Sequence, residues 1–151
     1  MSQSLSAVHV HLVFSTKERR AFLRHEGMRR EMHTYLGGVS RELECPPVQV
    51  GGVADHVHVL ARLGRTMTQS DWVKELKRAS SLWIKQKGAA YAGFQWQAGY
   101  ACFGVSQSNV AEVAEYVANQ ESKHGAMSFE VELRALLRKH EIEFDERYLW
   151  D

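Results

Sequence analysis

The chain has 151 residues, of which 44% are apolar and 25% are charged. Lysine plus arginine (19) nearly balance aspartate plus glutamate (18), so the net charge is +1. A chain of this length buries roughly two thirds of its unfolded surface, so a hydrophobic core can hold it without crosslinks. The balanced charge argues against a histone-like protein that coats polyanions by charge alone.

The charge is unevenly distributed along the chain. Residues 1–90 contain 14 lysines and arginines against 8 acidic residues, whereas residues 91–151 contain 5 against 10. A basic face that binds nucleic acid is therefore compatible with the nearly neutral total.

Cysteine content and hydropathy indicate the compartment. Cys45 and Cys102 are the two cysteines, too few for a disulfide framework or a cysteine-rich zinc site. The sequence contains no apolar run of about 20 residues and no signal-peptide pattern. We therefore expect a cytoplasmic protein that does not enter a membrane. Because the sequence has no internal repeat or linker, we expect one domain over residues 1–151.

Hydrophobic periodicity predicts eight elements in the order β-α-β-β-α-β-α-α. Strands are predicted at 7–16, 47–53, 55–63 and 94–105, and helices at 22–43, 68–87, 107–122 and 128–139. The first six elements match a split βαβ core of the ferredoxin-like or RRM-like type, in which helices cover one face of an antiparallel sheet. We therefore expect an α+β fold whose other sheet face is open to a ligand, a partner or a further helix.

The third predicted strand contains the first candidate site, His56-Val57-His58. Side chains alternate along a strand, so both imidazoles point to the same face and can share a metal ion. For an HxH motif without other information, two half-exposed histidines with no role are the more common explanation. Residues 9–11 form a second HxH motif, so spacing alone does not choose between the two pairs.

The helix over 107–122 contains the second candidate site. Tyr116 and Gln120 are four residues apart, so they lie on one face of a helix, at the border between core and solvent. A tyrosine at such a border usually only packs. Its hydroxyl can also be a covalent nucleophile, and a glutamine oxygen can bind a hard metal ion.

The helix over 68–87 is rich in lysine and arginine, and Lys17, Arg19 and Arg20 follow the first strand. Such residues contact phosphates, although a charged helix face is most often merely solvated. Neither a GxSxG elbow nor a Walker A loop occurs in the sequence. With only four aspartates, a carboxylate-based two-metal nuclease is unattractive.

Together these segments resemble the HUH single-tyrosine transposases of the TnpA type, which the smallest bacterial insertion sequences carry. The resemblance covers about residues 7–150. It rests on LVFSTKERR after the first strand, DHVHVL at the HUH position, LKRASSLWIK in the basic helix, FQWQAGYACFGVSQSNV, YVANQ with the tyrosine, and a tail ending in ERYLW.

The resemblance implies a role for each candidate residue. His56 and His58 fall at the HUH position and Gln120 at the third metal ligand, so these three residues are expected to hold Mg²⁺ or Mn²⁺. Tyr116 falls at the catalytic tyrosine, in helices that follow the ferredoxin-like core. Residues 9–11 lie in the family's first strand, which does not supply the HUH motif.

The resemblance also implies the activity and the partners. Such an enzyme cleaves and rejoins single-stranded DNA at insertion-sequence ends through a 5′-phosphotyrosine intermediate, in a bacterial or archaeal cytoplasm. It binds DNA hairpins and acts as a homodimer, and the sequence leaves open whether the tyrosine serves its own subunit or the partner. Candidate DNA contacts are Lys17, Arg19, Lys74, Lys77 and Arg78.

Two alternatives remain at this point. A domesticated or non-catalytic relative that binds hairpin repeats would have a similar sequence. A small metal-dependent hydrolase could use the HxH motif with water as its nucleophile.

Overall fold

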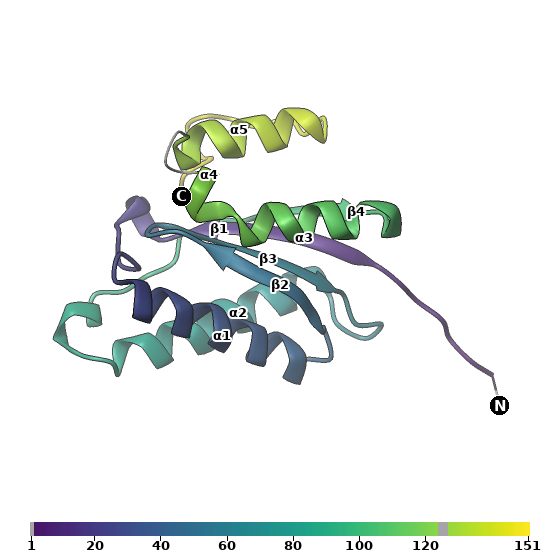
Figure 1. Ribbon diagram of the computed structural model, residues 1–151, viewed down its shortest axis with the longest axis horizontal. Helices are drawn as coiled ribbons and strands as arrows, with labels where there is room; N and C mark the ends of the chain where they lie inside the picture. The colour runs from purple at the N-terminus through teal and green to yellow at the C-terminus, as the bar shows by residue number, and fades with distance from the viewer. Residues whose placement is uncertain (1, 124–126) are drawn as a thin grey trace.

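A four-stranded antiparallel sheet forms the centre of the computed structural model, which describes residues 2–123 and 127–151 (Figure 1). The strands are β1 (His9–Ser15), β2 (Pro47–Gly52), β3 (His56–Arg62) and β4 (Ala101–Val105). Their spatial order is β2-β3-β1-β4, and every neighbouring pair is antiparallel. This is the arrangement of a ferredoxin-like core, so the predicted α+β fold is confirmed.

Helices cover both faces of this sheet (Figure 1). The first face carries α1 (Glu26–Glu42) and α2 (Gln69–Lys85). The second face carries α3 (Val110–Ala118), α4 (Gln120–Lys123) and α5 (Phe129–Lys139). Short 3-10 helices are η1 (Lys17–Arg19), η2 (Ala89–Tyr91) and η3 (Gln107–Asn109). The sequence predicted that this second face would be open to a ligand, a partner or a further helix. In the structure it is covered by helices of the same chain. No helix among the described residues is long and apolar enough to cross a membrane.

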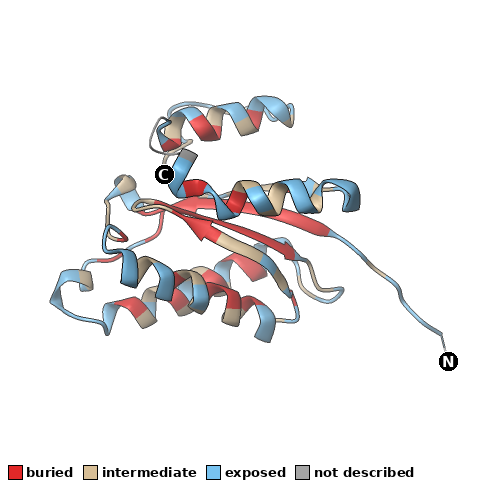
Figure 2. Cartoon of the chain, in the orientation of Figure 1, coloured by how far each residue is buried: buried red, intermediate tan, exposed pale blue. Residues whose placement is uncertain are grey.

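The first face is an apolar core, because alternate residues of β1 and β3 are hydrophobic. These side chains pack against the apolar stripes of α1 and α2, and the strands and parts of both helices are buried (Figure 2). The core includes Leu12, Phe14, Val57 and Val59 of the strands and Met32, Leu36, Trp72 and Leu76 of the helices. The buried tryptophans also satisfy their polar atoms. Trp72 Nε1 donates to Ser40 Oγ at 2.9 Å, and Trp96 Nε1 donates to Ser80 Oγ at 2.9 Å.

The second face has a smaller apolar cluster with polar residues beside it. Val13 and Phe103 of the sheet pack against three residues of α5, Phe129, Leu133 and Leu137. The same alternation that sends valines into the first core turns His11, His56 and His58 toward this second face. Between the sheet and the C-terminal helices, the fold therefore encloses buried imidazoles.

Two predicted elements differ from the structure. Within the strand predicted over 94–105, only Ala101–Val105 joins the sheet as β4, and Trp96 forms an isolated bridge with Thr16. The helix predicted over 107–122 is interrupted at Asn119, a residue type that competes with helical hydrogen bonding. Gln120 therefore starts α4 instead of continuing α3.

Gly51 of β2 allows α3 to lie directly against the sheet. A Cβ atom at this position would overlap the carbonyl oxygen of Val117. We predict that Gly51→Ala lowers the free energy of unfolding by about 1–3 kcal/mol, because the backbones must move apart. Gly38→Ala is the control, since a Cβ there meets nothing within 4 Å. It should stabilise α1 by about 0.5–1 kcal/mol. Urea unfolding compares the two variants, and a Gly51→Ala protein as stable as its parent would contradict the packing described.

Candidate active site

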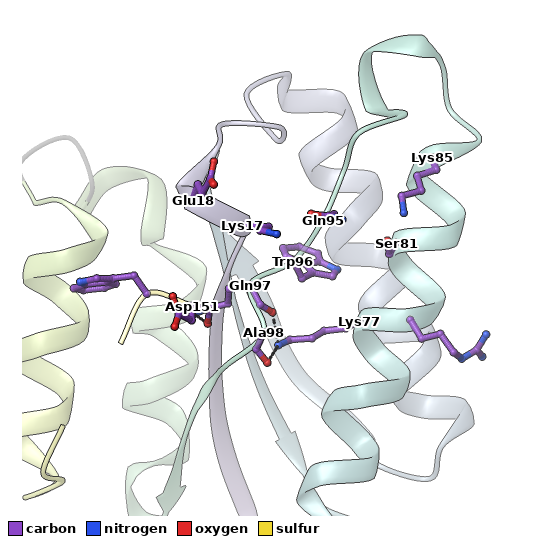
Figure 3. A pocket seen from close by; sticks show the side chains of 12 residues that line it. Lys17, Glu18, Lys77, Ser81, Lys85, Gln95, Trp96, Gln97, Ala98 and Asp151 are labelled. Atoms are coloured by element: carbon purple, nitrogen blue, oxygen red, sulfur yellow. Dashed lines mark hydrogen bonds between the residues drawn. The ribbon is translucent and has the colours of Figure 1, made fainter. Parts of the chain in front are cut away.

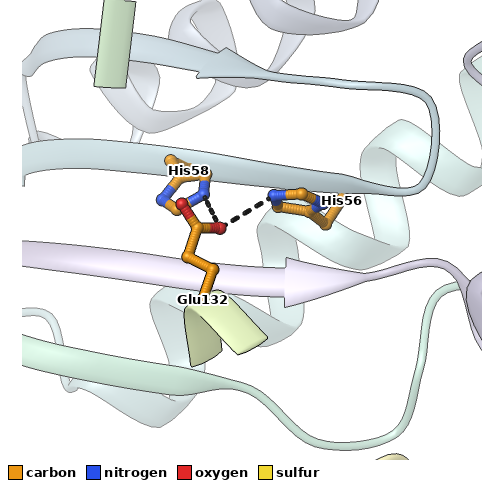
Figure 4. Close-up of side chains that lie close together, drawn as sticks. All are labelled: His56, His58 and Glu132. Carbon is orange, nitrogen blue, oxygen red and sulfur yellow. Dashed lines mark hydrogen bonds and ion pairs between the residues drawn. The ribbon is translucent and has the colours of Figure 1, made fainter. Parts of the chain in front are cut away.

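Three buried side chains from two elements meet on the second face of the sheet. His56 and His58 project from β3, and Glu132 reaches them from α5 (Figure 4). Glu132 Oε1 lies 3.1 Å from His56 Nε2 and 3.2 Å from His58 Nε2. The two histidines are fully buried, and Glu132 is 2% exposed. The carboxylate is therefore positioned by both imidazoles.

Tyr116 and Gln120 complete the cluster from the other C-terminal helices. The Tyr116 hydroxyl donates a short hydrogen bond to Glu132 Oε2, and Gln120 Nε2 donates to the same oxygen at 3.0 Å. Gln120 Oε1 lies 3.4 Å from His56 Nε2. Gln120 lies after the break at Asn119 and belongs to α4, not to the helix of Tyr116. Its side chain nevertheless points into the same cluster.

Outer partners hold both imidazoles. His56 Nδ1 lies 2.8 Å from Asp55 Oδ1, and His58 Nδ1 lies 2.8 Å from His11 Nε2. These contacts orient the rings so that both Nε2 atoms face Glu132. Burial opposes protonation of His56, but its hydrogen bonds to Asp55 and Glu132 outweigh this effect and raise the pKa of the ring.

Burial and hydrogen bonding shift other pKa values in the cluster. Burial raises the pKa of Tyr116, and the hydrogen bond and charge of Glu132 raise it further. Burial also acts to raise the pKa of Glu132, but hydrogen bonds from His56, His58 and Tyr116 hold it well below its usual range. Burial, assisted by His58, lowers the pKa of His11 to about 3. At neutral pH the site therefore combines a carboxylate, a protonated tyrosine and a neutral His11.

The donor set fits a divalent metal ion. The ligand atoms of His56, His58 and Glu132 all lie within 4.8 Å of one another. Two imidazole nitrogens and a carboxylate oxygen form a mixed nitrogen and oxygen set that suits divalent metals of intermediate hardness. Gln120 offers an amide oxygen close to His56, so it can add a fourth ligand to these three residues. A cation there would also balance the charge of the buried carboxylate.

The structure brings together all four residues predicted for chemistry, namely His56, His58, Tyr116 and Gln120. Sequence reasoning missed Glu132. A signal for it exists, because Glu132 interrupts the apolar stripe that Phe129, Leu133 and Leu137 form along α5. A charged residue at a core-facing helix position is uncommon unless it is paired.

Several of the basic residues lie around a groove of about 740 Å³ (Figure 3). Lys17, Lys77, Arg78 and Lys85 line the groove together with Trp96. Two successive aromatic contacts connect the groove to the buried cluster. The Phe129 ring lies 4.4 Å from that of His56 and 6.1 Å from that of Trp150, which lines the groove.

The five predicted DNA contacts have different surroundings. Lys77 Nζ donates to the carbonyl oxygens of residues 97, 98 and 99, and burial lowers its pKa to about 8. Arg78 pairs with a neighbouring glutamate on α2. Arg19 pairs with a glutamate of α5 and lies over the Trp150 ring. Lys17 and Lys74 are exposed, and Lys17 lines the groove.

The chain is similar to known proteins in sequence and in fold. The sequence profile of a family described as IS200-like transposases matches residues 4–120. A protein described as a candidate transposase from Deinococcus radiodurans R1 has a TM-score of 0.61 at 23% identity, over 80% of this chain and 98% of that one. A REP-associated tyrosine transposase bound to a REP hairpin has a TM-score of 0.60 at 14% identity, over 84% and 76%. No curated protein matches. At these identities the two structures establish the fold.

Removal of the Glu132 charge should weaken metal binding. We predict that Glu132→Gln binds Mn²⁺ at least about tenfold more weakly, because even outer partners of metal ligands contribute roughly 10–100-fold. Isothermal titration of the purified protein with Mn²⁺ measures this. Glu130→Gln is the matched control on the same helix, where the side chain pairs with Arg19 instead. Equal affinities for the two variants would show that Glu132 is not a ligand.

Proposed function

The chain belongs to the IS200-like transposase family, and we propose that it cleaves and rejoins single-stranded DNA at insertion-sequence ends through a 5′-phosphotyrosine intermediate. The observation that carries this proposal is the hydrogen bond between Tyr116 and Glu132, the carboxylate that also contacts both histidines. A hydrolase that activates water needs no tyrosine at its metal cluster. A tyrosine held there has the position of a nucleophile.

In the proposed reaction, His56, His58 and Gln120 would hold Mg²⁺ or Mn²⁺, and Glu132 would supply a further oxygen. A bound metal ion would offset the charge that develops on the scissile phosphate. The Tyr116 oxygen attacks phosphorus, and the bond from phosphorus to the 3′ oxygen breaks. The products are a 5′-phosphotyrosine and a strand whose 3′ oxygen takes up a proton. Attack by another 3′-hydroxyl reverses these steps and joins new ends.

Glu132 has a second task in this scheme. Its Oε2 accepts the proton of the tyrosine hydroxyl in a hydrogen bond, and this contact orients the phenol oxygen beside the two histidines. The raised pKa of Tyr116 keeps that proton on the tyrosine in the resting site. Attack on phosphorus therefore requires that the phenol loses this proton as the new bond forms.

The groove lined by Lys17, Arg78 and Lys85 suits a DNA strand. Lys17, Lys85 and Arg78 offer cations to phosphates, and Trp96 lines the same groove. Hairpin DNA as the partner is supported by the REP-associated tyrosine transposase that is bound to a REP hairpin. We propose Lys17, Arg19, Lys74, Lys77 and Arg78 as contacts, with Lys77 acting mainly through the segment that its ammonium group holds.

Tyr116 is expected to form a covalent adduct with DNA. Wild-type protein, Mg²⁺ and single-stranded DNA carrying a cognate hairpin should give a band on denaturing gels that Tyr116→Phe lacks, because phenylalanine has no attacking oxygen. An adduct that survives Tyr116→Phe would refute the assignment. Cleavage without an adduct would favour a hydrolase, and hairpin binding without cleavage would favour a non-catalytic relative.

The two HxH motifs are separated by a paired experiment. His56→Ala should abolish cleavage, because it removes one metal ligand. His9→Ala should leave cleavage intact, because that side chain lies outside the cluster formed around Glu132. Gel assays with the same hairpin substrate measure both variants. The reverse outcome would show that the metal-binding pair is the HxH motif of β1 and not that of β3.

The site also bears on whether one active site is formed by one subunit or by two. We propose that residues 1–151 form one HUH domain and that Tyr116 serves the histidines of its own chain, because Glu132 joins them in one subunit. A homodimer remains a prediction. In mixtures of Tyr116→Phe with His56→Ala, we expect no recovery of adduct formation. Recovery in the mixture would mean that one subunit lends its tyrosine to the partner's histidines.

A further inference from the structure

The first HxH motif of the chain has no role in the proposed reaction, yet one of its histidines contacts the metal cluster. In the antiparallel pair of β1 and β3, Val13 lies opposite His58 and His11 lies opposite Leu60. His11 is therefore the diagonal neighbour of His58 on the same face of the sheet. The two rings stack with centroids 5.0 Å apart, and His11 Nε2 lies 2.8 Å from His58 Nδ1.

This contact determines which nitrogen of His58 faces the metal site. An imidazole that offers Nε2 to a metal carries its proton on Nδ1, and that proton needs an acceptor. Nε2 of His11 is at hydrogen-bond distance for this purpose. We propose that His11 is a positioning residue that selects the tautomer and ring orientation of His58 for metal binding. This inference rests on the metal site of the proposed function.

Asp55 provides the parallel case. Its carboxylate lies 2.8 Å from Nδ1 of His56, so each histidine of the HUH motif has one outer partner. The partners differ in charge, because one is a carboxylate and the other is an imidazole. A carboxylate raises the basicity of the imidazole it contacts more than a neutral acceptor does. The orientation of His58 thus depends on an uncharged acceptor, whereas that of His56 depends on a carboxylate.

His9 serves as an internal control. It lies two residues before His11 on the same strand and the same face, and it is also buried. Its neighbours across the sheet are Arg62 and Val105, at the end of the strand away from His56. Among the described residues, His9 Nδ1 has no hydrogen-bond partner. A general effect of histidine loss from β1 would therefore appear in both variants.

A packing role for His11 is the competing explanation. The ring contacts His58 and also lies 6.0 Å from the rings of Phe103 and Tyr116. Two substitutions separate the explanations. His11→Phe keeps an aromatic ring and removes the acceptor, whereas His11→Gln loses the ring and keeps an acceptor near the position of Nε2. Packing favours the phenylalanine variant, and positioning of His58 favours the glutamine variant.

The test measures Mn²⁺ binding by isothermal titration of the full-length protein, without DNA. We expect His11→Phe to bind roughly 10–100-fold more weakly than wild type, His11→Gln to recover most of the affinity, and His9→Gln to match wild type. Nitrogen-15 NMR of wild type loaded with Mg²⁺, which is diamagnetic, should show the His58 proton on Nδ1.

Three results would overturn the inference: wild-type affinity in His11→Phe, no gain of His11→Gln over His11→Phe, or a His58 proton on Nε2. If His11→Phe does not fold, His11→Leu replaces it with the same expected loss and the same contradicting result. Failure of the wild-type protein to bind Mn²⁺ is a separate outcome, which overturns the metal site of the proposed function and this inference with it.

Discussion

The buried carboxylate of Glu132 is the charge on which the arrangement of the second sheet face depends. A carboxylate in a closed interior is stable only when hydrogen bonds and opposite charge compensate for lost water. Here His56, His58, Tyr116 and Gln120 supply that compensation from β3, α3 and α4. The same contacts that satisfy the charge therefore fix the nucleophile and the candidate metal ligands relative to one another.

One face of the sheet forms the main hydrophobic core, and the other face holds the candidate site. The first face packs two long helices on an apolar core and gives β3 a rigid support. The second face holds a polar cluster enclosed by shorter helices and a small apolar patch. A site gains accuracy when its side chains stand on rigid elements and when outer partners lock their orientation. His56 and His58 meet both conditions, through β3 and through Asp55 and His11.

Local patterns predicted a large part of this organisation. Alternation along residues 55–63 placed His56 and His58 on one face, and the element order gave the sheet topology. Long-range features were less accessible. Glu132 joins the site from 76 residues beyond His56, and nothing in its local sequence specifies that distance.

Other differences have local causes that periodicity does not record. The helix carrying Tyr116 ends at Ala118 because Asn119 leaves the helical conformation. Spacing did not distinguish the two HxH motifs. Only the register of β1 against β3 shows that His11 lies at hydrogen-bond distance from His58. The resemblance assigned the metal to His56 and His58, the pair that meets Glu132 in the structure, but it gave no role to the other motif.

The most direct measurement is anomalous diffraction from crystals of the protein grown with Mn²⁺. We expect one strong manganese peak coordinated by Nε2 of His56, Nε2 of His58, Oε1 of Gln120 and a carboxylate oxygen of Glu132, with the Tyr116 hydroxyl beside it. A peak bound by His9 or His11, or a Glu132 side chain turned away from an ion held by the other residues, would contradict this expectation.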